Sequence, residues 1–549
     1  MPEPDPFTKH YAASLDGIYD VVDRLVLRAY FSLGGSPGGF RTWWRQLHGT
    51  DANLDNAHIM RMAGRFGRRL RAWAQKRNIP VVFCAAGERK DHKAQEYLPK
   101  DPNFRGIFAV LISRAPAPVW EAVRFPNGTL DLRRKTSFPL VNHYAFHILD
   151  QQWGHVIIRI CGQVPFGALV ILNGHEYTAC QARKAGLAFR KEDNCFTEVS
   201  NARGLAKVAE TLRSPTAIGR LRQVCERWIY RCLCFGLPFE EQKKSGFRYS
   251  YSVFQAEYSR NLLFARGQKL QQTLDGVIDR TRSQLDIKTV KTIFGVRRRR
   301  FQRGGKPLRC ELVIERPVYD LTIFKVHYGR LTLKAYTKGE RVLRIEAIAH
   351  HVADLRCGQI LPAFPAVIAR LAQLLERFLQ CLQCVDAPWV GAELLERLSL
   401  PTGQGRSRLA GLNLNKPRVR AAMEAVMALC GQPTGFTAAQ HAEKVREILG
   451  AEGSTYGPRQ AAYDIKKLRA KGLVSKTAPS ARTYQGTRHG LRAIAALVVL
   501  RDKVLLPLLE ATTATQPAPR PAPGTPLDAA YERLRREMQH LLTLLNIAA

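Results

Sequence analysis

The segment 437–490 constrains the fold of this chain more strongly than any other, because two helix signals and a hairpin signal follow one another in it. Thr437 can cap a helix whose apolar residues share one face, and a glycine ends that helix. Pro458 suits the first turn of a second helix, which also stops at a glycine. Short β-prone stretches at 473–475 and 482–484 then flank a Pro-Ser turn. We therefore expect two packed helices followed by a β-hairpin.

The second helix of this segment has two chemically different faces. Ala461, Ile465 and Leu468 share an apolar face, which leaves the opposite face for solvent or a ligand. A helix with an apolar underside and a basic, aromatic upper side, followed by a basic hairpin, suits entry into the major groove of DNA. The residues that we expect to contact nucleic acid are Arg459, Gln460, Tyr463, Lys466 and Lys467 on the helix, with Lys476 and Arg482 on the hairpin.

The run Tyr-Asp-Ile-Lys-Lys-Leu-Arg-Ala-Lys-Gly-Leu-Val-Ser-Lys at 463–476, with Tyr484 and Gly490 downstream, resembles the winged helix-turn-helix domains of MarR-type transcription regulators. The resemblance covers about a tenth of the chain and implies a winged helix over 417–510 that contacts DNA. Winged helices also occur in replication proteins and transposases and mediate protein–protein contacts. The resemblance is therefore fairly specific for the fold but not for the biological process.

The charge of the whole chain points to a polyanionic partner. Eighty-four Lys and Arg against 46 Asp and Glu give a net charge of +38. Membrane-surface binding or adaptation to an unusual habitat is the alternative explanation. No uncharged apolar run reaches membrane-spanning length, because even 491–509 is interrupted by Arg501, Asp502 and Lys503. The first residues show no signal-peptide pattern, so we expect a cytoplasmic protein without a membrane partner.

Length and local patterns predict several domains of α/β and α+β type. Residues 1–200 alternate helix and strand signals, which favours an α/β domain with a mixed sheet. A strand–helix–strand unit over 81–113 predicts a parallel crossover. The helix expected at 56–76 carries a basic side on which Arg61, Arg65 and Arg68 are candidate nucleic-acid contacts.

Residues 201–398 are expected to form a second domain, helical at first and then antiparallel β. We expect helices at 219–234 and 254–285, followed by strands from about 309 to 348. Between them lies a basic loop, 287–306, whose guanidinium groups can bridge phosphate oxygens. Its candidate contacts are Arg297, Arg298, Arg299, Arg300 and Arg303.

The C-terminal part predicts a spacer and a tethered helix. Residues 511–526 are rich in Pro and form an extended linker, and 527–549 carry leucines at helical spacing. The apolar helices expected at 488–510 and 527–549 are the candidate contacts of a homodimer. Twelve scattered cysteines fit free thiols, and Cys381 and Cys384 lie in a helical pattern, so we predict no metal site from cysteines.

The segment 331–346 is similar to the Tyr-Asp-Lys-Gly turn, followed by Leu-Arg-x-Glu, of phage and plasmid replication initiators and some mobile-element proteins. A strand with Lys334 and Tyr336 would turn at Lys338-Gly339 and pair with a strand that carries Arg344 and Glu346. Alternation would then place these residues on related sheet faces, as a phosphate-handling surface to which Lys338 also belongs. Thr337 stands where that pattern has Asp. The His-apolar-His metal pair of those endonucleases is also missing, because the pairs His350–His351 and His143–His147 have other spacings.

Three acids are candidates for catalysis because they lie in or beside apolar strands, where a bare carboxylate is costly. They are Asp23, Glu176 and Glu346, and as converging carboxylates they could hold Mg²⁺, the one cofactor we consider. A salt-bridged structural role is the alternative for each of them.

These observations favour a multidomain DNA-binding protein that acts in replication, recombination or transposition of a mobile element, or in transcription regulation. The enzyme alternative is a metal-dependent nuclease or transposase. A third alternative is an RNA-binding protein partnered with a structured RNA, since charge spread over the chain suits a large surface that reads shape.

Overall fold

The computed structural model describes residues 6–85, 87–88, 90–127, 129–270, 310–311, 322–328, 330–386, 397–403, 408–414, 416–430, 432, 435–450, 455–500, 529, 533 and 536–537. The basic loop with Arg297, Arg298, Arg299, Arg300 and Arg303, the linker 511–526 and most of the terminal helix 527–549 lie outside the described residues. The chain divides into two compact units. The sheet unit is Ala13–Leu270 with Glu311–Leu375, and the helical unit includes the described residues from Glu376 to 500.

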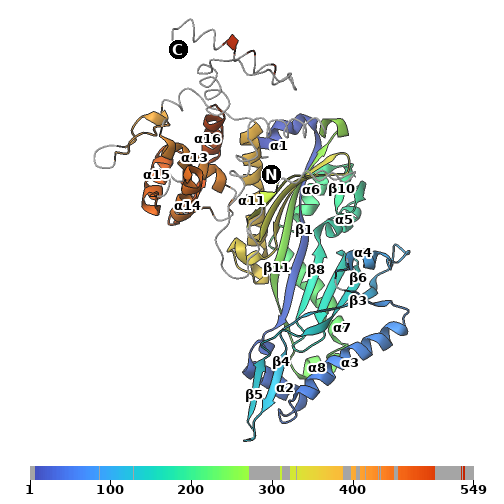
Figure 1. Ribbon diagram of the computed structural model, residues 1–549. Coiled ribbons are helices and arrows are strands. Elements are labelled where there is room, and N and C mark those ends of the chain that lie inside the picture. The colour runs from blue at the N-terminus through green and yellow to red at the C-terminus, as the bar shows by residue number, and fades with distance from the viewer. Residues whose placement is uncertain are drawn as a thin grey trace, which may run out of the picture. The chain divides into compact units, whose positions relative to one another are not determined.

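An eleven-stranded mixed sheet forms the centre of the sheet unit (Figure 1). In the strand order given below, each strand from β13 to β3 pairs antiparallel with its neighbour, whereas β2, at the edge, runs parallel to β3. The mixed sheet and the parallel crossover expected from the sequence are therefore confirmed. In spatial order the strands are β12 (Cys310–Glu311), β13 (Thr322–Tyr328), β14 (Leu331–Lys338), β15 (Val342–Ala349), β11 (Tyr249–Phe264), β1 (Leu15–Phe31), β8 (Ala168–Asn173), β7 (Gly154–Cys161), β6 (Leu140–Asp150), β3 (Gly106–Pro116) and β2 (Val81–Phe83).

Two long strands, β1 and β11, lie side by side in the middle of this sheet and pair over most of their length. The helix expected at 254–285 is wrong over 254–264, which belong to β11. Tyr249, Tyr251 and Val253 alternate with small polar residues, a period of two that suits a strand. Since β11 also pairs with β15, one sheet takes strands from both sides of the domain boundary expected near residue 200.

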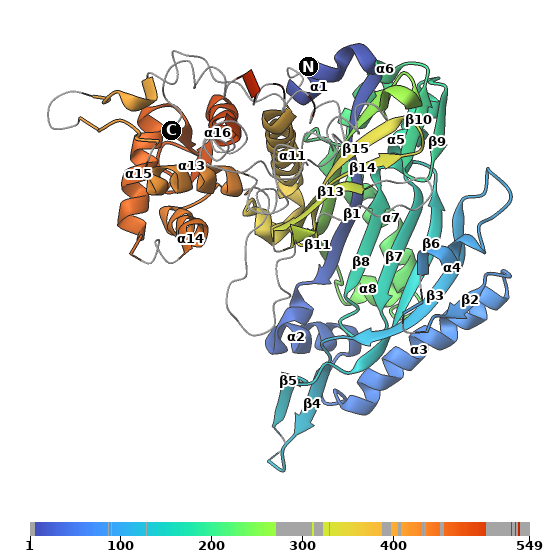
Figure 2. The ribbon, with the colours of Figure 1, turned by 45° about the horizontal axis from the view of Figure 1, so that its top comes forward.

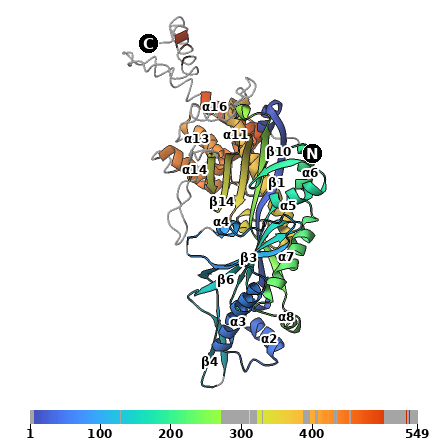
Figure 3. The same cartoon turned by 90° about the vertical axis from the view of Figure 1, so that its right-hand side faces the viewer.

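Helices cover both faces of the sheet, and the side chains of β6 show why. Tyr144 and Phe146 point to the face where they pack against Phe66 of α3 (Asn56–Gln75), whereas Ala145 packs with Ala94 of α4 (Lys90–Gln95) on the other face. Figure 3 shows α5, α6 and α7 along one side of the sheet. The remaining helices of this unit are α2 (Pro37–His48), α5 (Gly174–Lys184), α6 (Ala202–Glu210), α7 (Ala217–Leu233) and α8 (Phe239–Lys244), and α11 (Phe364–Asp386) begins in it.

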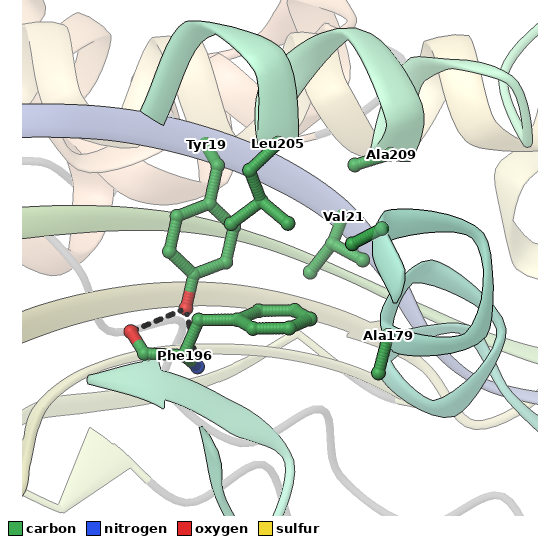
Figure 4. Close-up of a cluster of buried hydrophobic side chains, with 7 residues drawn as sticks. Tyr19, Val21, Ala179, Phe196, Leu205 and Ala209 are labelled. Carbon is green, nitrogen blue, oxygen red and sulfur yellow. Dashed lines mark hydrogen bonds between the residues drawn. The ribbon is translucent and has the colours of Figure 1, made fainter. Parts of the chain in front are cut away.

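Two small hairpins complete the sheet unit. One is made of β4 (Trp120–Arg124) and β5 (Leu130–Arg134), with Pro126 and Asn127 in the turn between them (Figure 2). The other is made of β9 (Phe189–Glu192) and β10 (Cys195–Val199). Phe196 of β10 packs in a buried cluster with Tyr19 of β1 and Leu205 of α6, and the Tyr19 hydroxyl hydrogen-bonds the backbone of Phe196 (Figure 4). This cluster attaches the second hairpin to the N-terminal part of β1.

The helical unit contains α13 (Pro417–Leu429), α14 (Ala438–Leu449), α15 (Pro458–Ala470), the hairpin β16 (Val474–Lys476) and β17 (Tyr484–Gly486), and α16 (Arg488–Leu500). Thr437 caps α14: its side chain accepts from the Gln440 amide, and the Gln440 side chain accepts from the Thr437 amide. Small apolar residues, among them Ala425, Ala442 and Ala461, pack α13, α14 and α15 together.

Candidate nucleic-acid interface and buried charge cluster

The outward face of α15 is basic and aromatic. Arg459, Tyr463 and Lys466 are exposed, and the Lys467 ammonium lies 5.1 Å from the centre of the Tyr463 ring. Arg459 and Lys466 form no hydrogen bond or ion pair within the described part of the chain. These cations are therefore available to an anionic ligand.

A buried polar contact fixes the opposite face of α15. Asp464 is only 3% exposed, and its carboxylate accepts hydrogen bonds from the Tyr456 hydroxyl at 2.8 Å and the Arg418 guanidinium at 2.9 Å. Ile465 and Leu468 are buried beside it. Because Asp464 is the sole acidic residue of α15 and Arg418 neutralises it, the exposed face of the helix carries only positive charge.

Two of the expected nucleic-acid contacts are engaged within the protein. The Gln460 side chain accepts a hydrogen bond from the Gly457 amide at 2.7 Å and so caps α15. The Lys476 ammonium donates to the Pro479 carbonyl at 3.0 Å, across the turn of the hairpin. Arg482 is exposed. The hairpin is held near the helix because the Arg469 guanidinium lies over the Tyr484 ring, 5.9 Å from its centre.

In the sheet unit, β14 and β15 form the antiparallel pair expected from the sequence. Lys334 lies opposite Glu346, and Tyr336 lies opposite Arg344. The Lys334 ammonium is 3.6 Å from the Glu346 carboxylate, and the Tyr336 hydroxyl is 3.4 Å from it. Lys338, at the end of β14, is 3.8 Å from the Asp193 carboxylate.

Arg344 is the centre of a cluster of buried charges. Its side chain is wholly buried and lies 2.5 Å from the Asp23 carboxylate of β1 and 3.5 Å from that of Glu346. It also donates to the Asn194 carbonyl, in the turn between β9 and β10, at 2.7 Å. Asp23 contacts in addition His175, at the start of α5. Asp23 stands out in the sequence as a carboxylate within an apolar strand, but no local signal identifies Arg344 as its partner.

Burial and neighbouring charges set the protonation of this cluster. Burial alone would raise the pKa of Asp23, but Arg344 and His175 hold it well below its ordinary value. Burial lowers the pKa of His175, and the Asp23 carboxylate only partly offsets this. The pKa of Glu346 is raised because burial outweighs the attraction of Arg344. A neutral imidazole and an Asp23–Arg344 ion pair therefore form the core of the cluster.

Glu257 of β11 is a further member that sequence analysis missed. Burial, together with the nearby carboxylates of Glu346 and Asp23, raises its pKa to about 7. Its carboxylate accepts a hydrogen bond from the Gln255 side chain at 2.8 Å. Its position, two residues before Ser259, which pairs with Glu346, puts it on the same face of the sheet.

The three acids considered for catalysis are all held by basic side chains. Arg344 contacts both Asp23 and Glu346, and Glu176 is instead ion-paired with Lys191 at 2.5 Å. Across the described ranges, no group of three or more His, Cys, Asp or Glu is arranged to hold a metal ion. Each of the three acids thus has a basic partner, as in the structural alternative.

The three candidate arginines on the basic side of α3 also differ in whether they have a partner within the protein. Arg65 is ion-paired with Glu241 at 2.6 Å and donates to the Gly236 carbonyl at 2.7 Å, so it holds α3 against α8. Arg61 and Arg68 are exposed.

We compared the chain with protein-family models, curated proteins and solved structures and found no significant match. Of the helices that the structure describes, none is both long and apolar enough to span a membrane.

Proposed function

We propose that this chain is a multidomain DNA-binding protein whose residues 417–510 include a winged helix, with α15 as the helix that enters the major groove. One observation carries the proposal: the exposed face of α15 is free of acidic residues, while the acid on its buried face is neutralised by Arg418. A net charge of +38 supports a polyanionic partner.

In this proposal the residues of α15 have separate tasks. Arg459 and Lys466 are exposed without an internal partner within the described residues, so they are the candidates for base edges or phosphates. Tyr463 comes between these two residues in the sequence, and its ring contacts the Lys467 ammonium. Gln460 keeps its capping role. The size of the chain, with a large sheet unit besides this segment, favours replication, recombination or transposition over simple repression.

The test begins with the nucleic acid that copurifies with the full-length protein, identified by DNase and RNase sensitivity and by sequencing. Fluorescence anisotropy then measures binding of the full-length protein to a labelled duplex of the recovered sequence and to a scrambled duplex. We expect Arg459→Gln and Lys466→Gln each to weaken binding by about 5- to 150-fold if they contact bases, which is the equivalent of 1–3 kcal/mol.

The matched control is Arg408→Gln, which removes the same charge from an exposed position outside the proposed winged helix. A base contact loses affinity for the recovered sequence only, whereas a phosphate contact loses it on both duplexes. If both α15 variants bind as tightly as the control, α15 is not the recognition helix. Copurifying RNA, with no affinity for duplex DNA, would overturn the DNA assignment in favour of the RNA-binding alternative.

A further inference from the structure

A second basic surface lies in the sheet unit, on α3. This helix is held rigidly, since Phe66 and Leu70 are fully buried and the ion pair of Arg65 with Glu241 fastens its middle. At its N-terminus, Asn56 exchanges two hydrogen bonds with the backbone of Ala122, in the β4–β5 hairpin. Figure 2 shows α3 as a long, straight helix beside β3 and β2. Its outward face is therefore presented in a fixed orientation.

That outward face is a continuous stripe. At 100° per residue, one third of the helix circumference contains positions 57, 60, 61, 64, 68, 71, 72 and 75, and all eight residues are exposed. Three of them are arginines, Arg61, Arg68 and Arg71, and none is acidic. Ala57, Gly64 and Ala72 are small, so a ligand could approach the helix backbone closely. We call these eight residues the α3 stripe.

The arginines of the α3 stripe differ from many others in this unit. Arg61, Arg68 and Arg71 form no ion pair or hydrogen bond within the described residues. Several other surface arginines of the unit do have a carboxylate partner; examples are Arg41 with Asp51 at 2.8 Å, Arg330 with Asp354 at 2.7 Å and Arg213 with Glu210 at 3.8 Å. The acid nearest the stripe in sequence, Asp55, accepts from the His58 amide as the cap of α3.

We propose that the α3 stripe is a second DNA-contact surface, which binds the phosphate backbone of a duplex without reading its sequence. With a rise of 1.5 Å per residue, Arg61 and Arg71 are about 15 Å apart along the helix, so the three guanidinium groups can contact several phosphates. Arginine suits this task because its planar donors bind phosphate oxygens in pairs. The inference rests on the proposed DNA-binding function, but it concerns a different unit and a different kind of contact.

The test uses the full-length protein and a fluorescein-labelled 30-base-pair duplex of arbitrary sequence, with affinity measured over a range of salt concentrations. Replacing Arg61, Arg68 and Arg71 together by Gln should flatten the plot of log affinity against log salt by roughly two to three units, because each phosphate that a guanidinium neutralises contributes just under one unit to the slope. Replacing the same three by Lys should preserve most of the slope, because the charges remain.

A control variant removes equal charge from another part of the same unit. Arg190→Gln, Arg203→Gln and Lys207→Gln act on exposed side chains of β9 and α6, and they should leave the slope unchanged. Gly64→Glu is an independent variant that should not harm folding, because Glu favours a helix more than Gly does. A Cβ at position 64 would lie 3.1 Å from the flexible end of Arg68, so the new carboxylate can neutralise that guanidinium. We expect this variant also to flatten the slope.

The outcomes separate this inference from the proposed function. If the α15 variants weaken binding while the α3 variants retain the wild-type slope, the α3 stripe is only a solvated face and the inference is overturned. If the α3 variants flatten the slope and the α15 variants have no effect, the stripe is supported and the winged-helix proposal fails. A wild-type protein without measurable affinity for the duplex overturns both.

Discussion

Replacing Glu257 by Gln removes one charge from the buried cluster of the sheet unit with almost no change of shape. Burial and the carboxylates of Glu346 and Asp23 raise the pKa of Glu257 from an ordinary value of 4.5 to about 7. The hydrogen bond from Gln255 can persist, because the amide of the new side chain keeps a carbonyl oxygen. The variant therefore isolates the cost of ionising this side chain.

The sign and size of the effect follow from the two pKa values. An acid whose pKa is raised in the folded protein favours folding while it is protonated. That contribution is complete below pH 4.5 and is lost as the pH rises through 7. One pKa unit corresponds to about 1.36 kcal/mol of the free energy of unfolding. Relative to Glu257→Gln, the free energy of unfolding of the wild-type protein should therefore fall by about 3 kcal/mol at pH 8 and by under about 1 kcal/mol at pH 5.

Urea unfolding followed by tryptophan fluorescence measures this difference, since six of the seven tryptophans lie in the sheet unit between residues 43 and 228. We expect Glu257→Gln to unfold at a clearly higher urea concentration than the wild-type protein at pH 8.0 and at nearly the same concentration at pH 5.0. The control Glu240→Gln, on an exposed side chain, should follow the wild type at both pH values. If wild type and Glu257→Gln show the same dependence on pH, Glu257 ionises as an ordinary surface acid and the reasoning fails.

Two other substitutions test the cluster and the helical unit. Arg344→Met leaves the wholly buried Asp23 without its cation and should lower the free energy of unfolding by about 3–5 kcal/mol. The control Lys334→Met, at a side chain that is 31% exposed, should lower it by about 1 kcal/mol or less. Equal losses in urea unfolding would contradict the burial of the Asp23–Arg344 pair. Thr437→Ala removes the cap of α14 and should destabilise the helical unit by about 1 kcal/mol. The helical circular dichroism signal should then be lost at a lower temperature on heating. An unchanged melting curve would show that the cap does not stabilise α14.

Local pattern is enough to predict several elements of the sheet. Pairing of the strand that carries Lys334 and Tyr336 with the one that carries Arg344 and Glu346 is expected from a turn near Gly339 and from the period of two in strand alternation, although the turn lies at 339–341 and not at Lys338-Gly339. Residues 254–264 are mistaken for part of a helix, because Gln255, Ala256 and Glu257 favour a helix and the stretch Arg-Asn-Leu-Leu-Phe at 260–264 does not alternate. Pairing with β1 determines its conformation, and that information is not local.

Partners distant in sequence are the other source of error. Asp23 and Arg344 meet only because β1, β11 and β15 are neighbours in the sheet, an order that neither local sequence reveals. Likewise, nothing near Arg65 indicates its ion pair with Glu241. The cap formed by Gln460 could have been foreseen, since Gln at the third position of a helix is a capping signal.

The position of β1 in the sheet has a consequence for synthesis of the chain. β8 can pair with one edge of β1 as soon as residue 173 is made, but β11, which covers the other edge, begins 234 residues after the start of β1. At roughly 5–20 residues per second, the ribosome takes about 10–50 s to supply it. During that time the nascent chain carries a long apolar strand edge, and Asp23 is still without Arg344. β1 therefore depends on strands made much later for its native environment, and a shortened chain ending before β11 should aggregate.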